Sequence, residues 1–162
     1  MPRTLIIGYG NPDRGDDGVA YYLINALRQH LGENALGEDA TGQEELGGEI
    51  DSVFFLQLVP ELMDTAADYD QIIFVDAHVG EDVDDLNCAP VVPAYTSSPF
   101  THHMTPSTFL VMLKLLHDKT PAGYIVSVRG HDFDFRRGLS ADTERLVGPA
   151  LQRILQLIGP IK

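Results

Sequence analysis

Apolar positions along the chain form short unbroken runs that alternate with segments of helical periodicity. The segments 5–8, 50–58, 71–75 and 124–128 predict strands, and the unbroken run at 71–75 is typical of a parallel strand covered on both faces. The pair Val91–Val92 predicts a short edge strand. Helical spacing predicts helices over about 17–31, 106–117 and 140–158, and a short one starting at Pro60. This alternation predicts an α/β fold in three layers, a mostly parallel twisted sheet with helices on both faces.

The segment 32–48 interrupts this pattern. Glycine, acidic residues and asparagine dominate it, and apolar residues are sparse. We expect an acidic, solvated and mobile loop within one domain that spans residues 1–162. A chain of 162 residues is long enough for one domain with its own core and short for two.

Charge and hydropathy exclude several classes of protein. The net charge of −13 argues against nucleic acid as a partner, because phosphate contacts need lysine and arginine. The longest apolar stretch, Phe109–Leu116, is broken by Lys114 and is much shorter than the roughly 18 residues that cross a membrane. The apolar run after Met1 is too short for a signal peptide. We therefore expect a cytoplasmic protein without membrane insertion.

Cys88 is the only cysteine, which excludes an internal disulfide and a thiolate metal cluster. No catalytic pattern surrounds Cys88, and we interpret it as a small residue near the start of a strand. Any metal site in this chain must then use histidine and carboxylate ligands.

Acidic and histidine side chains follow the predicted strands. Asp16 and Asp17 end the loop after the first strand, and Asp76 closes the strand at 71–75. His102 and His103 lie in a loop just before the helix at 106–117. Ligands of open parallel sheets bind beyond the carboxyl ends of the strands, where these loops meet. Two carboxylates and one imidazole would make an open site for a divalent ion such as Ni²⁺ or Zn²⁺.

Other interpretations of these residues are simpler. The first loop is not a dinucleotide fingerprint, because Asp13 stands where the third glycine belongs and the loop is acidic. Asp16 or Asp17 is also the natural cap of the helix that follows. Asp76 would be costly to bury at the end of a strand unless it met a cation or hydrogen-bond donors.

Four blocks of this sequence resemble the nickel–iron hydrogenase maturation endopeptidases. Residues 8–18, Gly-Tyr-Gly-Asn-Pro-Asp-Arg-Gly-Asp-Asp-Gly, are similar to the family signature G-x-G-N-x-x-x-x-D-D/E-G. Residues 57–62, 73–77 and 101–106 resemble three further blocks in the same order, and residues 129–140 resemble the segment before the last helix. The resemblance covers nearly the whole chain and implies a phosphorylase/hydrolase-like fold.

The resemblance also implies a function and a site. A family member removes the C-terminal extension of a hydrogenase large-subunit precursor after nickel insertion. By position, the metal ligands would be Asp17, Asp76 and either His102 or His103. We prefer His102, because the apolar positions of the following helix match the spacing after the family histidine. The metal would be nickel, held by the enzyme or supplied by the substrate, and Asp16 or Asp17 would act as general base.

Two alternatives remain open at this stage. The chain could be a non-catalytic nickel-sensing chaperone of the immature subunit, or a zinc hydrolase on the same fold. The long acidic segment departs from the family pattern, and it is either a partner-contact loop or a tolerated insertion. The sequence does not specify the oligomeric state.

Overall fold

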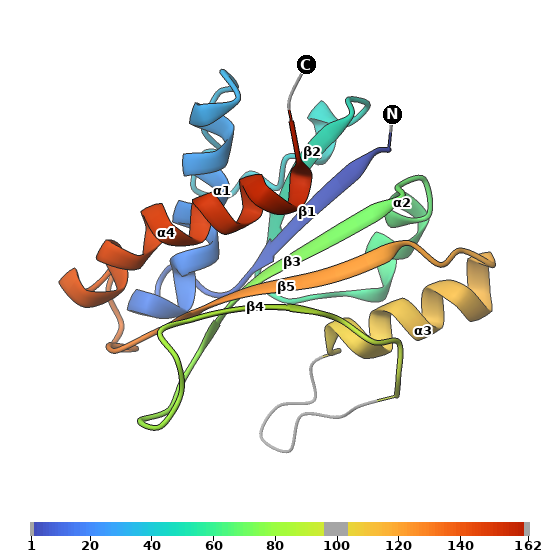
Figure 1. The fold of residues 1–162 in the computed structure, drawn as a ribbon. Coiled ribbons are helices and arrows are strands. Elements are labelled where there is room, and N and C mark those ends of the chain that lie inside the picture. The colour runs from blue at the N-terminus through green and yellow to red at the C-terminus, as the bar shows by residue number, and fades with distance from the viewer. Residues whose placement is uncertain (1, 96–103, 161–162) are drawn as a thin grey trace.

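A five-stranded sheet forms the centre of the protein, as the computed structural model in Figure 1 shows; the structure describes residues 2–95 and 104–160. The strand order is β2-β1-β3-β5-β4. Strands β2, β1, β3 and β5 run parallel, and β4 is antiparallel to β5. The bounds are β1 Thr4–Tyr9, β2 Ile50–Phe55, β3 Gln71–His78, β4 Leu86–Pro90 and β5 Ala122–Arg129.

Helices cover both faces of this sheet. Helices α1 (Val19–His30) and α4 (Ala141–Ile158) pack on one face, and α2 (Met63–Ala66) and α3 (Pro106–His117) pack on the other (Figure 1). Thr105 caps α3 and Ser140 caps α4, each accepting a hydrogen bond from the amide three residues on. The predicted three-layer α/β fold is confirmed.

Alternate residues of the central strands supply two separate cores. Ile6, Ile73 and Val75 face α1 and α4, whereas Ile72 and Phe74 face α2 and α3. Because both faces of β1 and β3 are buried, these strands are apolar throughout, which is the pattern seen in the sequence. Because β1 and β3 pair in parallel, their carboxyl ends lie side by side at the same end of the sheet.

The edge strand differs from the prediction. Strand β4 ends at Pro90, so the expected strand at Val91–Val92 is wrong, and Cys88 lies in the middle of β4. Strand β4 pairs on one side only and buries its residues partially, with Asn87 exposed between Leu86 and Cys88. The sequence of such an edge strand mixes polar and apolar residues and forms no continuous apolar run. For this reason the hydrophobic pattern did not predict β4.

The start of α1 also differs. A 3₁₀ turn over Gly15–Gly18 precedes the helix, which begins at Val19. No side chain caps α1, so the prediction that Asp16 or Asp17 caps it is wrong. Both carboxylates accept hydrogen bonds from other parts of the chain instead.

Several contacts attach the acidic segment 32–48 to the rest of the protein. Leu36 is buried, and its amide donates to the Asn25 side chain at 2.8 Å. The buried Arg28 binds Glu45, and the Phe54 amide of β2 donates to the Thr41 carbonyl at 3.0 Å. The segment thereby covers the free edge of β2.

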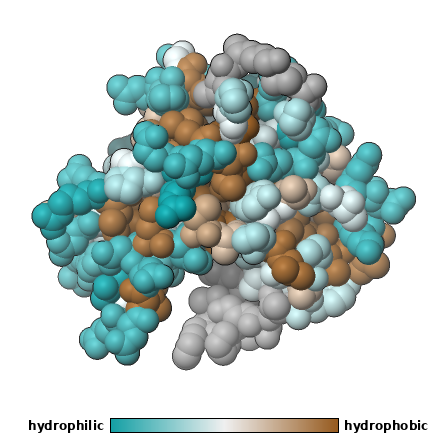
Figure 2. Space-filling view, viewed as in Figure 1, coloured by the Kyte–Doolittle hydropathy of each residue, from teal (hydrophilic) through white to brown (hydrophobic). Residues whose placement is uncertain are grey.

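Figure 2 shows polar residues over most of one face, with apolar patches between them, one of which lies over α3. Leu115 and Leu116 of that helix are mostly exposed. Within residues 2–95 and 104–160, no helix is long and apolar enough to cross a membrane.

Candidate functional site

A cleft of about 460 Å³ opens at the carboxyl ends of β1 and β3. Asp17, from the loop after β1, and Asp76, from the end of β3, both line it. The structure thus brings together the two carboxylates that the sequence predicts to share a site. The remaining described residues of the wall are Tyr9, Gly10, Leu56, Gln57, Leu58, Ala77, Met104, Thr105 and Pro106.

Two glycines allow the first loop to fold tightly beside this cleft. Gly10 has φ +145°, and a Cβ atom there would lie 2.1 Å from the Asp17 carbonyl oxygen. A Cβ atom on Gly18 would lie 2.5 Å from the Cα of Pro12. The Asn11 amide donates to Asp17 Oδ2 at 2.9 Å, which orients that carboxylate. The glycines of the first block are therefore required by backbone packing.

Asp76 lies in an environment that opposes its ionisation. Burial raises its pKa, a hydrogen bond from the Ala77 amide lowers it, the negative charge of Asp17 raises it, and the Tyr9 hydroxyl lowers it. The net result is a pKa of about 7. Asp17 and Asp76 repel each other when both are ionised, and a bound cation would offset this repulsion.

We predict that Asp76→Asn stabilises the metal-free protein at pH 8. The folded pKa lies above the usual 3.8, so wild-type stability falls as pH rises from about 4 to 7. The pKa shift corresponds to a difference of roughly 4 kcal/mol in the free energy of unfolding between Asp76→Asn and wild type. Because Asp76 is partly exposed, we expect about 2 kcal/mol, which is a rise in Tm of roughly 4–8 °C. Thermal unfolding in chelator at pH 8 and pH 5 measures it. An equal effect at both values would contradict the raised pKa.

Tyr9 is a site residue that the sequence reasoning missed. Its hydroxyl interacts with Asp76, and burial and that carboxylate together raise its pKa well above the usual value. It therefore stays a neutral donor to Asp76 at physiological pH. Its position at the end of β1, between the two glycines of the first block, is the signal that could have identified it.

Asp16 has a different environment from Asp17. It is fully buried and accepts five hydrogen bonds, from the amides of His131, Asp132 and Ser140 and the hydroxyls of Ser140 and Thr143. Burial would raise its pKa, but these donors lower it to about 2. Asp16 does not line the cleft, so its geometry gives no support to the prediction that it is a general base.

The two predicted ligand histidines, His102 and His103, lie outside the described residues. The chain resumes at Met104, and Met104, Thr105 and Pro106 line the cleft. The start of α3 is thus next to Asp17 and Asp76. Among residues 2–95 and 104–160, no group of three or more histidine, cysteine or acidic side chains is placed to hold a metal ion.

The remaining histidines are placed elsewhere. His78 contacts the Ser127 hydroxyl at 2.5 Å and the Asp84 carbonyl at 2.7 Å, outside the wall of the cleft. His117 ends α3 beside Asp64, and His131 contacts Thr143. His30, at the end of α1, is exposed. None of these four lines the cleft.

Solved structures of known proteins share this fold. The hydrogenase maturating endopeptidase HybD from E. coli superposes with a TM-score of 0.71 at 22% identity, covering 96% of this chain and 91% of that chain. An endopeptidase from Escherichia coli gives 0.68 at 21% identity, over 95% and 90% of the two chains. The [NiFe] hydrogenase maturation protease HybD from Thermococcus kodakarensis gives 0.63 at 15% identity, over 97% and 99%.

These similarities are structural. No protein-family model matches the chain, and no curated protein matches it in sequence. At such low sequence identities the superpositions show a shared fold and no more. The shared fold extends over almost the full length of both superposed chains. The chain therefore has the α/β fold of the nickel–iron hydrogenase maturation endopeptidases.

Proposed function

We propose that this protein is an endopeptidase that removes the C-terminal extension of a nickel–iron hydrogenase large-subunit precursor in the cytoplasm. The observation that carries the proposal is the pairing of Asp17 and Asp76 in one cleft, next to the start of α3. The four sequence blocks converge on this cleft, and the proteins that share the fold include hydrogenase maturation proteases.

The proposed role of the carboxylates is to recognise nickel carried by the precursor. Asp17 and Asp76 offer oxygen ligands with an excess of negative charge, and His102, or else His103, would add an imidazole nitrogen. This donor set fits a borderline divalent ion and leaves positions for the substrate. When bound, the ion would polarise the scissile carbonyl.

Hydrolysis is proposed to proceed by direct attack of water. Among the described residues of the cleft wall there is no serine or cysteine, and Cys88 lies on the edge strand β4. An ionised carboxylate of the pair can accept the proton of the attacking water. Asp17 is our candidate for this base, because it lines the cleft whereas the adjacent Asp16 does not.

A cleavage assay with nickel-loaded and nickel-free precursor tests the proposal. Wild-type protein is expected to release the C-terminal fragment from the loaded precursor and at least 100-fold more slowly from the nickel-free one. Mass spectrometry of the products measures both rates. Binding to the precursor without cleavage would favour the chaperone function instead. Cleavage that is independent of nickel, with zinc bound stoichiometrically to the purified protein, would favour the zinc hydrolase.

A further inference from the structure

A second cavity lies next to the cleft, at the carboxyl end of the edge strand β2. Its volume is also about 460 Å³, and Leu56 and Gln57 line both spaces. The loop after β1 contributes to both as well, with Pro12 and Asp13 in the second cavity and Asp17 in the cleft. The two spaces are therefore neighbours that share a wall of two residues.

Apolar side chains form one side of the second cavity. Phe54, Phe55, Leu56 and Val59 line it. Leu56, which follows the last residue of β2, is 69% exposed. Together with the other apolar residues of the wall it offers a contiguous apolar surface on which a partner side chain could pack.

Charged residues also line the second cavity. They are the carboxylates of Asp13, Glu38 and Asp39 and the cation of Arg137. Arg137 forms ion pairs with two of these carboxylates: its Nε lies 2.8 Å from Asp13 Oδ1, and its Nη1 lies 3.9 Å from Glu38 Oε1. Three carboxylates against one guanidinium leave a net charge of −2 beside the apolar wall.

The acidic segment 32–48 supplies much of this second cavity, from Glu38 to Thr41. Its position is set by the hydrogen bond from the Phe54 amide to the Thr41 carbonyl and by the buried Leu36. The backbone of the segment is therefore held beside β2, while the side chains of Glu38 and Asp39 remain exposed at the mouth of the cavity. The segment that departs from the family pattern is also the one that completes this cavity.

We propose that the second cavity is a substrate subsite, which binds the precursor polypeptide beside the bond to be cut. Its occupant is an apolar side chain, packed on Phe55, Leu56 and Val59, with a lysine or arginine next to it facing Glu38 and Asp39. The apolar wall and the net negative charge select this chemistry. The identity of the substrate rests on the proposed function, whereas the chemistry of the occupant rests on the cavity alone.

The strand order gives the path of the bound chain. Strands β2, β1 and β3 are consecutive neighbours. The second cavity lies at the end of β2, Asp17 lies in the loop after β1, and Asp76 lies near the end of β3. A polypeptide in the second cavity that passes over Leu56 and Gln57 enters the cleft that Asp17 and Asp76 line. Contacts in the second cavity would thereby add to the binding of the precursor without touching the reacting bond.

Binding of two synthetic peptides tests the subsite without requiring cleavage. One is a ten-residue peptide with blocked ends in which leucine alternates with lysine, and the other replaces every lysine with glutamate. We expect the leucine–lysine peptide to bind at least tenfold more tightly and to shift the NMR amide signals of Phe55, Leu56 and Val59. The double variant Glu38→Gln, Asp39→Asn is expected to weaken its binding at least fivefold.

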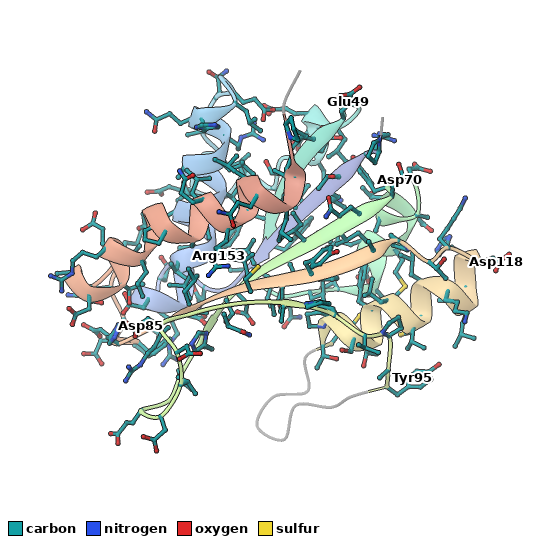
Figure 3. The ribbon with its side chains drawn as sticks, viewed as in Figure 1. Glu49, Asp70, Asp85, Tyr95, Asp118 and Arg153 are labelled. Atoms are coloured by element: carbon teal, nitrogen blue, oxygen red, sulfur yellow. The ribbon has the colours of Figure 1, made fainter. Side chains whose placement is uncertain are left out.

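The matched control removes the same charge elsewhere. Glu49→Gln with Asp118→Asn also deletes two exposed carboxylates, which lie before β2 and at the end of α3 (Figure 3). This double variant is expected to bind the leucine–lysine peptide within twofold of wild type. Equal weakening by both double variants would show attraction to net charge alone and would overturn the subsite.

Two other outcomes overturn the subsite: equal binding of the two peptides, and NMR shifts that avoid Phe55, Leu56 and Val59. Failure of the proposed function gives a different result, namely peptide binding at the cavity without cleavage of any precursor. Where cleavage does occur, Glu38→Gln with Asp39→Asn is expected to raise KM at least fivefold with kcat within twofold. A fall in kcat with an unchanged KM would contradict a binding subsite.

Discussion

Asp17→Asn and Asp76→Asn are each expected to slow cleavage of the nickel-loaded precursor more than 100-fold. Both substitutions keep the size of the side chain and remove a negative charge from the cleft that they share. If the pair recognises the metal, either change removes a ligand charge and misplaces the scissile bond, which costs roughly 3 kcal/mol or more of transition-state stabilisation. Single-turnover rates with excess enzyme isolate this step.

Suitable controls separate chemistry from folding. Asp64→Asn changes an exposed carboxylate outside the cleft, and its cleavage rate is expected to remain within twofold of wild type. Circular dichroism should show that all variants retain wild-type secondary structure. If Asp17→Asn and Asp76→Asn both cut within tenfold of wild type, the carboxylate pair is not the metal site.

The same assay distinguishes the two adjacent histidines. We expect His102→Ala to match the loss caused by Asp76→Asn, and His103→Ala to retain cleavage within tenfold of wild type. The opposite ranking would transfer the ligand role to His103 without changing the proposed reaction.

Asp16→Asn is expected to lower the free energy of unfolding by roughly 2–4 kcal/mol at pH 7. The five donors that surround Asp16 suit a carboxylate, and an asparagine amide group would place its own N–H bonds against some of them. Since Asp16 joins the first loop to the segment before α4, the loss affects both. Thermal unfolding should show a decrease in Tm of roughly 5–15 °C.

The effect of Asp16→Asn should depend on pH in a defined direction. The folded pKa of about 2 lies below the usual 3.8, so the stabilisation by Asp16 is complete above about pH 4 and decreases as pH falls toward 2. The difference in free energy of unfolding between wild type and Asp16→Asn should therefore decrease as the pH falls through that range. The exposed Asp64→Asn serves as the control, with little change at any pH. A difference that stays constant down to pH 2 would contradict the lowered pKa.

The central strands and most helices were predictable from the sequence because their burial is repetitive. Strands β1 and β3 are apolar throughout, and α3 spans Pro106–His117, the range that its periodicity predicts. Strand β4 escaped prediction because an edge strand is buried on neither face completely. Element boundaries next to glycine-rich turns, such as the 3₁₀ turn before α1, were also shifted by a few residues.

The candidate site was predictable only in part. The rule that loops meet at the carboxyl ends of parallel strands identified Asp17 and Asp76 as neighbours, and the structure places both in one cleft. The same reasoning did not tell which of Asp16 and Asp17 lines the cleft. The sequence of two adjacent acidic residues does not show where each side chain points. Tyr9 was missed because its contact with Asp76 joins two strands that are far apart in the sequence.

Hydrophobic periodicity and chain direction were enough to derive the layered α/β architecture and to place the candidate site at the carboxyl ends of the parallel strands. The different surroundings of Asp16, which is buried among hydrogen-bond donors, and of Asp17, which lines the cleft, became visible in the folded protein. The tertiary structure also decided that the acidic segment lies against β2 and completes a second cavity. Periodicity reports whether a position is buried, whereas the partners of a polar side chain depend on contacts between segments distant along the chain.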